Sequence, residues 1–412
     1  MTNSETKNFS QNVSSSYHLE DRGKCNKNTC ANARNVPKLR FKGYNDEWVE
    51  KRIEKVLKIK HGKDQKAIEN NDGIYPILAT SGEIGRSNTF LWDKPCVLIG
   101  RKGTINKPQY MDTPFWTVDT LFYSDVFQNN NAKYLYYLFN TINWKKYDES
   151  TGVPSLSAKT IERIKIKISN NLREQEKIAS FLTLIDKKIE KQKELVELLK
   201  KYKRGLLSAI FSQKMRFKDD NGNNYPAWEE KRLGDICKIV GGGTPDTNNV
   251  KYWGDDINWF TPTEIIKKYA DSSNRKISRL GLLKSSAKIL PIGTVLLTTR
   301  ATLGEMSILS IEATTNQGFQ SLIPVKDEVS SEFIYYCQPI IKHFCYKYAN
   351  GSTFLEISKQ TLAKLKLMIP NKDEQNKISD FLSKFDNKIQ QEECILSNLK
   401  TYKKGLLQQM FI

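Results

Sequence analysis

The chain has 412 residues, and its 65 lysines and arginines against 46 aspartates and glutamates give a formal net charge of +19. This length allows two to four domains, and the positive charge favours a polyanionic partner, nucleic acid first, although an adenine- and thymine-rich genome also raises the lysine content. No apolar run reaches the roughly 18 residues that span a bilayer, and the seven cysteines have scattered spacing, which argues against a membrane protein or a disulfide-bonded secreted protein and predicts a cytoplasmic one.

Residues 1–36 are a polar lead rich in serine and asparagine. This segment has neither the apolar core of a signal peptide nor enough apolar residues for a domain core, so we predict a disordered tail. His18, Cys25 and Cys30 could be imagined as metal ligands. Because no fourth ligand lies near them in the sequence, a metal site is the less favoured interpretation.

Residues 37–172 alternate short apolar runs with turn residues, which predicts a small α/β domain with strands near residues 74–78, 80–85 and 96–104. The last of these runs changes from a buried strand to side chains that donate hydrogen bonds or carry positive charge, namely Arg101, Lys102 and Thr104. Polar groups at a strand end suit the base edges and phosphates of a nucleic acid.

A long helix is predicted over residues 173–213, because apolar side chains recur there at alternating steps of four and three, as a heptad seam requires. The seam consists of Ile178, Leu182, Ile185, Ile189, Val196 and Leu199. Gln192 interrupts it, and a polar residue at this place either fixes the register with a partner helix or marks a local break that faces solvent. No proline or glycine precedes Gly205, so the helix can run for about 40 residues, or about 60 Å.

Residues 214–370 share landmarks with the first domain at their start, since Trp48 and Arg52 are echoed by Trp228 and Arg232. The sequence then diverges, with strands expected near residues 257–264, 293–300 and 313–319. Similar ends around a divergent middle indicate one scaffold that carries two different surfaces. Polar side chains again stand at or near the ends of the expected strands: Thr261, Thr263, Glu264, Arg300, Thr302, Asn316 and Gln317.

Residues 371–412 repeat the first helix. Thirty-five residues from Arg173 recur without a gap from Asp373, and sixteen of the pairs are identical, where unrelated sequences would share about two. Phe181 and Phe381 add apolar surface outside the seams, which suits a partner subunit, an adjacent domain or packing within the chain. The second seam consists of Ile378, Leu382, Phe385, Ile389, Leu396 and Leu399, with Glu392 in the place of Gln192.

The simplest use of two similar long helices in one chain is to pair them with each other, antiparallel, as a spacer between two domains. We therefore predict an α+β fold in which two globular α/β domains form a tandem pseudo-repeat. Two long α-helices join these domains and form an antiparallel coiled coil.

These features resemble a known family, the specificity subunits of bacterial type I restriction-modification systems. The resemblance covers nearly everything after residue 37. It rests on the order and duplication of four marks: the tryptophan-containing start of each half, Val-Leu-Ile-Gly-Arg-Lys-Gly at 97–103, Thr-Thr-Asn-Gln-Gly at 314–318, and the Glu-Gln-x-Lys-Ile-x-x-Phe-Leu opening of each helix. Gly-Ser-Thr at 351–353 has only a partial counterpart in Thr-Gly-Val-Pro at 151–154.

The resemblance implies two target recognition domains, each of which reads one half of an asymmetric bipartite sequence in double-stranded DNA. It implies that the helices set the gap between the half-sites and dock two methylation subunits, which use S-adenosylmethionine to methylate adenine N6. A larger assembly with restriction subunits is a further implied state. The chain itself is then a non-catalytic subunit, with no cofactor of its own and no membrane contact.

Arg101, Lys102 and Arg300 are the main candidates for DNA contact, although a strand-end arginine also suits a salt bridge in solvent. Weaker candidates are Ser81, Arg86, Thr104, Thr261, Thr263, Glu264, Thr302, Asn316 and Gln317. Glu264 fits a cap for a helix that begins near Ile265 better than a contact to cytosine. Four lysines are candidates for phosphate contacts, with a solvated helix face as their default place: Lys145, Lys146, Lys342 and Lys347.

Two other classes of protein compete with this interpretation. A methyltransferase would need a glycine-rich cofactor loop and an Asn/Asp-Pro-Pro-Tyr/Phe motif, and the sequence contains neither. A DNA-binding regulator with a coiled-coil spacer explains the charge and the helices but not two divergent domains. Trp48, Trp228 and the paired aromatic runs at 134–137 and 333–336 are expected to anchor cores and not to stack on bases.

Overall fold

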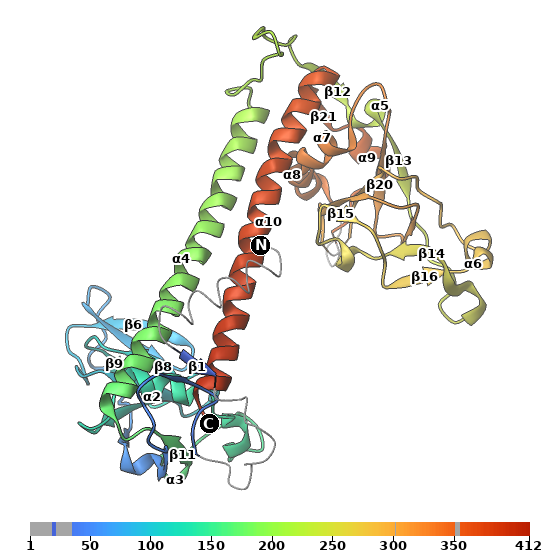
Figure 1. Ribbon diagram of the computed structural model, residues 1–412. Helices are drawn as coiled ribbons and strands as arrows, with labels where there is room; N and C mark the ends of the chain where they lie inside the picture. Colours follow the sequence, from blue (N-terminus) through green and yellow to red (C-terminus); the bar gives the residue numbers. More distant parts are fainter. Residues whose placement is uncertain (1–18, 22–34, 301, 351–354) are drawn as a thin grey trace. The chain divides into compact units, whose positions relative to one another are not determined.

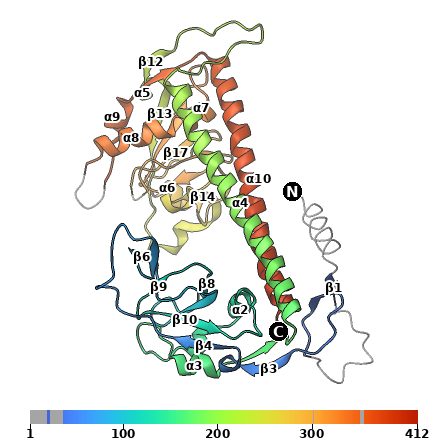
Figure 2. The ribbon, with the colours of Figure 1, turned by 90° about the vertical axis from the view of Figure 1, so that its left-hand side faces the viewer.

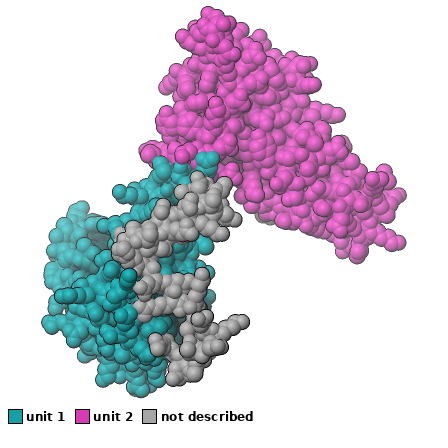
Figure 3. Space-filling view, viewed as in Figure 1, with its two compact units in different colours: residues 1–196, 391–412 teal, residues 197–390 magenta. Residues whose placement is uncertain are grey.

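The computed structural model describes residues 19–21, 35–300, 302–350 and 355–412, and Figure 1 and Figure 2 show its ribbon in two views. The chain divides into two compact units (Figure 3): the first unit is Met1–Val196 with Gln391–Ile412, and the second unit is Glu197–Gln390. Each unit combines an α/β domain with segments of two long helices, α4 (Leu172–Phe211) and α10 (Lys372–Met410).

The first unit is built from short strands and short helices that precede α4. In chain order they are β1 (Leu19–Asp21), β2 (Leu39–Phe41), β3 (Val49–Arg52), η1 (Ile53–Lys55), β4 (Leu57–Lys60), β5 (Tyr75–Ala79), β6 (Gly82–Ser87), β7 (Cys96–Gly100), β8 (Gln109–Met111), β9 (Trp116–Thr117), β10 (Leu121–Val126), α2 (Ala132–Phe139), η2 (Trp144–Tyr147), α3 (Ala158–Arg163) and β11 (Lys165–Ile168).

The sheets of the first domain have the strand orders β4-β10-β7-β8, β6-β5-β9 and β11-β3. All five residues of β7 are buried, as a continuous apolar run in the middle of a sheet requires. Helix α2 packs on β7 and β8, and the side chain of Asn131 caps it by accepting a hydrogen bond from the Tyr134 amide. Trp48, Tyr134 and Tyr137 are fully buried in this core, as expected from the sequence.

The second unit follows the same plan with additions. In chain order its elements are β12 (Glu229–Arg232), α5 (Leu233–Ile236), β13 (Cys237–Gly241), η3 (Val250–Tyr252), β14 (Trp253–Phe260), η4 (Pro262–Glu264), β15 (Tyr269–Ala270), β16 (Arg275–Ile277), α6 (Arg279–Leu283), β17 (Val295–Leu297), β18 (Met306–Leu309), β19 (Thr314–Thr315), β20 (Gln320–Pro324), α7 (Ser331–Tyr336), α8 (Gln338–Tyr348), α9 (Lys359–Ala363) and β21 (Lys366–Ile369).

The strand orders of the second domain match those of the first. They are β13-β20-β17-β18-β15, β16-β14-β19 and β12-β21. Strand β15 extends the first of these sheets, and each remaining strand of the second domain has a counterpart in the first, whereas the β1-β2 pair has none among the described strands of the second domain. The match includes an uncommon detail, because β5 pairs with β9 in parallel and β14 pairs with β19 in parallel. The two divergent segments therefore share one topology, which confirms the predicted pseudo-repeat.

Segments of the two long helices pair antiparallel within each unit. In the first unit, α4 residues up to Val196 face α10 residues from Gln391, and Leu406, Met410 and Phe411 complete the core beside Ile178 and Leu182. In the second unit, Ile210 lies in the core beside Ile378 and Leu382. The predicted antiparallel coiled coil is thus confirmed, and 40 residues of α4 match the predicted helix length.

The structure corrects part of the expectation for residues 1–36. Leu19–Asp21 forms β1, which pairs antiparallel with β2, within the segment that we predicted to be a disordered tail. His18, Cys25 and Cys30 lie outside the described residues, as does the Gly-Ser-Thr segment at 351–353. Among the helices of the described ranges, none is long and apolar enough to cross a membrane.

Candidate nucleic-acid interface

Three strands of the first domain end at one place, which we call the first rim and define as residues 80–81, 101–104, 118–120 and 154–156. The parallel pairing of β5 with β9 places their carboxyl ends side by side, and the Val118 amide donates to the Leu78 carbonyl at 3.0 Å. The Arg101 amide donates to the Thr120 carbonyl at 2.8 Å, which brings the end of β7 to the same place. Strand ends at a shared edge are a common position for binding groups.

The first rim contains Ser81, Arg101, Lys102 and Thr104 from the sequence prediction. Arg101 forms an ion pair with Asp119, which comes from the end of β9. Lys102 is exposed, and Gly103, with a φ of +83°, makes the turn that follows it. The loop at 154–156 closes the rim, because the Gly103 amide donates to the Pro154 carbonyl at 2.8 Å.

The second domain has an equivalent second rim, which we define as residues 261–264, 298–300, 302–304, 316–318 and Glu356. The parallel pair here is β14 with β19, and the Asn316 amide donates to the Phe260 carbonyl at 3.0 Å. The Thr299 amide donates to the Gly318 carbonyl at 2.8 Å, which brings in the end of β17. The second rim gathers Thr261, Thr263, Glu264, Arg300, Thr302, Asn316 and Gln317.

Arg300 in the second rim also carries an acidic partner. Its guanidinium lies 2.8 Å from the Glu356 carboxylate, and both side chains are about two-fifths exposed. The Arg300 Nε is buried and has no hydrogen-bond partner. Both strand-end arginines therefore form a salt bridge, the alternative to a free DNA-contacting side chain that the sequence left open, and in each case the partner is an accessible carboxylate.

Glu264 forms a capping box, as favoured from the sequence, but not for the element we expected. Its carboxylate accepts hydrogen bonds from the Thr261 amide at 2.7 Å, the Thr261 hydroxyl at 2.6 Å and the Asn274 amide at 2.6 Å. The box closes the short turn η4, and no helix begins at Ile265, since the next element is β15. These three hydrogen bonds tie η4 to the segment that precedes β16.

Other predicted contact residues lie outside the two rims or at their margin. Arg86, on β6, forms an ion pair with Glu83 at 3.1 Å. Lys145 and Lys146 are exposed on η2. Lys342, on α8, pairs with Glu305 beside Gly304, at the margin of the second rim, and Lys347 is exposed further along α8.

The sequence did not single out Asp119 and Glu356. Asp119 follows β9, a strand of two residues, which is too short to show an alternating pattern. Glu356 lies far along the chain from Arg300. Arg275 was missed too, and its guanidinium carbon stacks 3.6 Å from the centre of the Trp253 ring on the antiparallel pair β14–β16.

Most of the predicted helix-contact residues are covered within their own unit. Phe181 is buried and its ring meets that of Phe41 edge-on at 5.7 Å, while Phe381 packs between Phe217 and Phe385. The remaining seam residues are buried or half-buried: Ile178, Leu182, Ile185, Ile189, Val196, Leu199, Ile378, Leu382, Ile389, Leu396 and Leu399. Gln192 donates to the Glu392 carboxylate at 2.5 Å and to its carbonyl at 3.1 Å, so the polar seam position pairs the helices and does not face solvent.

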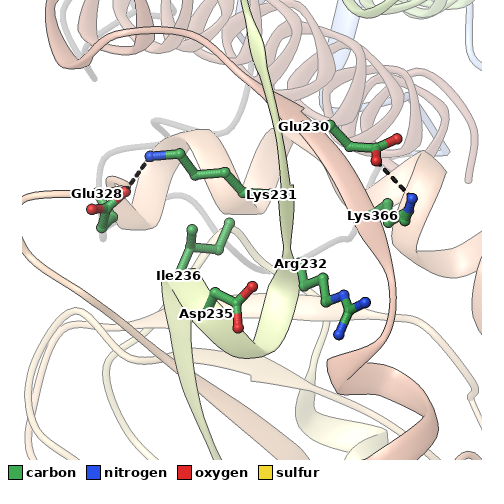
Figure 4. Close-up of a pocket in the computed structure, with 7 residues that line it drawn as sticks. All are labelled: Glu230, Lys231, Arg232, Asp235, Ile236, Glu328 and Lys366. Carbon is green, nitrogen blue, oxygen red and sulfur yellow. Dashed lines mark hydrogen bonds and ion pairs between the residues drawn. The ribbon is translucent and has the colours of Figure 1, made fainter.

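A cleft of about 420 Å³ lies beside the small sheet β12-β21 (Figure 4). Its lysines already have acidic partners, since Lys231 bonds Glu328 at 2.5 Å and Lys366 bonds Glu230 at 2.7 Å. In the part of the chain that the structure describes, no group of three His, Cys, Asp or Glu residues is placed to hold a metal ion. These lysines are already paired with carboxylates across the cleft, which leaves the two rims as the candidate interface.

Two domains of one topology, each with a different polar rim and each packed on a shared helix pair, define a tandem-domain recognition scaffold. Comparison with known protein families identifies the family to which this scaffold belongs. The profile of the type I restriction modification DNA specificity domain matches residues 45–200 and 226–401, and the chain belongs to this family.

Curated relatives and solved structures agree with this assignment. The chain is 36% identical over 194 residues to the MjaIX specificity subunit of Methanocaldococcus jannaschii, covering 46% of this chain and 45% of that one. It is 26% identical over 270 residues to the EcoR124I/EcoR124II specificity subunit of Escherichia coli, covering 62% and 63%. The chain thus spans about half to two thirds of the length of these relatives.

Two solved structures have the same fold. The S subunit of a type I restriction-modification system from M. genitalium is 18% identical and superposes with a TM-score of 0.60, with coverage of 92% of this chain and 99% of that one. A chain from a type I restriction-modification complex is 15% identical with a TM-score of 0.54, with coverage of 88% and 97%. At these identities the likeness concerns the fold.

Proposed function

We propose that this chain is the DNA-specificity subunit of a type I restriction-modification system and that each domain reads one half of an asymmetric bipartite site. The observation that carries the proposal is the pair of rims: one topology presents two different sets of polar side chains at the same strand ends. A protein that recognises a palindromic site would carry the same residues in both rims. Different rims on one scaffold call for two different half-sites.

The chemistry of the rims suits base edges. An arginine can donate two hydrogen bonds to O6 and N7 of a guanine, and threonine, asparagine and glutamine pair with other bases. Arg101 and Arg300 supply the first group, and Thr302, Asn316 and Gln317 supply the second. In the free protein, the carboxylates of Asp119 and Glu356 accept hydrogen bonds from Arg101 and Arg300. In the complex with DNA, O6 and N7 of a guanine would accept from the same guanidinium groups in place of the carboxylates.

The formal net charge of the whole chain, +19, favours binding to DNA because basic side chains attract its phosphates. Exposed lysines such as Lys145, Lys146 and Lys347 add affinity without sequence preference in this proposal. Their replacement by alanine should reduce binding to all DNA sequences alike.

The proposed assembly places catalysis in other chains. Two methylation subunits dock on this chain and methylate adenine with S-adenosylmethionine, and restriction subunits join a larger complex. This chain then contributes recognition and spacing, with no active site and no cofactor of its own. Support comes from family membership and from the two-domain scaffold.

Mapping of methylated adenine tests the proposal. Genomic DNA from cells that express this chain with its neighbouring methylation subunit is sequenced by a long-read method, beside DNA from cells that express the methylation subunit alone. A split motif that depends on this chain is expected. If the complex assembles and no motif appears, the chain is not an active specificity subunit, and binding to a single DNA site without the methylation subunit would favour a regulator.

A further inference from the structure

Each unit contains a cluster of tyrosine, aspartate and lysine that joins three helices. In the first unit, the Tyr137 hydroxyl on α2 donates to the Asp186 carboxylate on α4 at 2.7 Å and lies 3.3 Å from the Thr183 hydroxyl. Lys403 on α10 binds the other oxygen of Asp186 at 2.5 Å. Its ammonium also lies 5.4 Å from the centre of the Tyr137 ring. One carboxylate therefore holds the domain helix and both long helices.

The second unit repeats this cluster. The Tyr336 hydroxyl on α7 donates to Asp386 on α10 at 2.7 Å and lies 3.0 Å from the Ser383 hydroxyl. Lys203 on α4 binds the second oxygen of Asp386, and its ammonium lies 5.4 Å from the Tyr336 ring centre. Lys268 adds two bonds that the first cluster lacks, donating to the Tyr336 hydroxyl at 3.1 Å and to Ser383 at 2.7 Å.

The lysines are exchanged between the two repeats. A constant offset of 200 relates Asp186 to Asp386 and Lys203 to Lys403 in the sequence. Asp186 nevertheless binds Lys403 and Asp386 binds Lys203. Each domain helix is thus fastened to the aspartate of its own repeat and, through it, to the lysine of the other repeat.

These clusters are better placed than exposed helix-surface pairs to fix geometry. Exposed ion pairs contribute little because solvent screens them, but about four fifths of the Lys403 and Lys203 side chains are covered. Burial raises the pKa of both tyrosines well above the usual value, so their hydroxyls stay protonated and can donate. A carboxylate with donors on both oxygens is held in one orientation.

We infer that Tyr137–Asp186–Lys403 and Tyr336–Asp386–Lys203 are positioning residues that set the orientation of each recognition domain on the long-helix segments of its own unit. The inference rests on the proposed function and deepens it. Its consequence is a crossed dependence: the half-site read by the first domain depends on Lys403, which follows the second domain in the chain, and the other half-site depends on Lys203.

The test uses Lys403→Met and Lys203→Met in the full chain with its methylation subunit. Lys403→Arg keeps the ion pair, and Lys404→Met removes a neighbouring exposed lysine of α10 as the matched control. Methylation is measured at sites with one mismatched base in either half-site. The half-sites are assigned to domains beforehand, by exchanging residues 37–172 for those of another specificity subunit.

Lys403→Met should reduce discrimination in the first domain's half-site on the order of tenfold and leave the other half-site unchanged, because misplacement by a fraction of an ångström spoils base contacts. Lys203→Met should act on the other half-site and more weakly, since Lys268 still holds Tyr336 there. Lys403→Arg should restore discrimination. Equal effects on both half-sites, or effects no larger than those of Lys404→Met, overturn the inference.

Hydrogen exchange on the isolated chain separates this inference from the proposed function. Lys403→Met should raise amide exchange in α2, and Lys203→Met should raise it in α7, whether or not the chain directs methylation. A wild-type chain that gives no split motif counts against the proposed function alone. Unchanged exchange in α2 and α7 counts against the crossed clusters.

Discussion

Arg101 and Arg300 follow the equivalent strands β7 and β17, and the structure gives both of them a carboxylate partner. Such pairs between partly exposed side chains contribute little to stability, with a median of about 0 to 1 kcal/mol. Their geometry matters more than their strength, because a paired arginine is held at the rim in one conformation. Holding an arginine in place lowers the entropy that its contact with a base would cost.

Arg300→Ala should therefore weaken the reading of one half-site only. A bidentate contact to guanine accounts for about 1 to 3 kcal/mol of discrimination, and Lys cannot replace it because its ammonium lacks the planar fork. The measurement is the binding of the assembled methylation complex to duplexes that carry single substitutions in each half-site, with Arg300→Lys beside Arg300→Ala. Arg101→Ala is the matched variant and should affect the opposite half-site. An equal loss on unrelated DNA would reassign Arg300 to phosphate contact.

Arg40 and Arg216, which hold equivalent places in the two repeats, have a structural role. Arg40 and Glu174 are almost fully buried and joined at 2.6 and 2.9 Å, whereas Arg216, which binds Glu374 at 2.8 Å, is about one quarter exposed. Removing one partner of a buried pair strands the other charge, at a cost of about 3 to 5 kcal/mol. Water can approach the pair in the second unit and reduce this cost.

Arg40→Met should thus destabilise the first unit by several kcal/mol, within the range of about 3 to 5, and Arg216→Met should destabilise the second unit less. Denaturant unfolding followed by hydrogen exchange of α2 and α7 assigns each loss to its unit. The double variant Arg40→Met with Glu174→Gln should recover part of the loss, because it removes the stranded charge. Equal losses for Arg40→Met and Arg216→Met would show that burial does not decide the cost.

At the scale of elements, the helix pair has one polar layer in an apolar seam. Gln192 and Glu392 fill the same position of the two repeats and bond to each other, and the Glu392 side chain is buried. Polar groups at such a position cost stability but select a register.

Gln192→Leu should destabilise the first unit by about 1 to 3 kcal/mol, because the buried Glu392 loses a donor. Replacing both residues by leucine should instead raise the melting temperature, since two apolar side chains fill the layer. Thermal unfolding of the three chains measures both effects. A double leucine variant that is less stable than the wild type would mean that the layer is stabilising and not only selective.

The sequence predicted those elements whose signal is local. The heptad period and the duplicated landmarks predicted both long helices, and turn-bounded apolar runs predicted β5, β6, β7, β14, β17 and β19. The pairing of β5 with β9 and of β14 with β19 joins residues about 40 to 55 positions apart, and no local pattern encodes such pairing. The rims follow from that pairing, which is why Arg101 and Arg300 were predicted but Asp119 and Glu356 were not.

Prediction from local sequence also failed where the sequence around a residue is compatible with more than one structure. Glu264 was correctly expected to cap, but the residues after it form β15 and not a helix. Phe181 offered an apolar face for several partners, and only the fold shows that Phe41 covers it. Leu19–Asp21 gained a strand through its pairing with β2, a contact that a polar composition does not suggest.

At the scale of the whole molecule, the end of the long helix of each repeat contributes an aromatic side chain to the domain core of the other repeat. Phe211 and Phe411 are related by the same offset of 200. Phe411 packs against Trp48 and Tyr134 of the first domain, whereas Phe211 packs against Trp228 and Phe333 of the second. Each domain core is thus completed by the end of the long helix that follows the other domain in the chain. Such closure suits a spacer whose length is fixed by both helices together.

Deleting residues 190–196 and 391–397 together tests the spacer. The two heptads face each other at the Gln192–Glu392 layer, and their removal keeps the seam because seven residues are close to two helical turns. The helices shorten by about 10 Å, which corresponds to about three base pairs at 3.4 Å each. Methylated-adenine mapping should show the same half-sites with a gap shortened by about that amount, and with weaker methylation because the half-sites also rotate relative to each other.

The matched control removes only residues 190–196. One shortened helix cannot keep the seam and both domain contacts, so the apolar layers no longer meet and the complex should lose methylation altogether. An unchanged gap in the double deletion, with the shortened chain folded and assembled, would mean that contacts of the methylation subunits set the spacing. A shortened gap would assign that spacing to the chain's own helices.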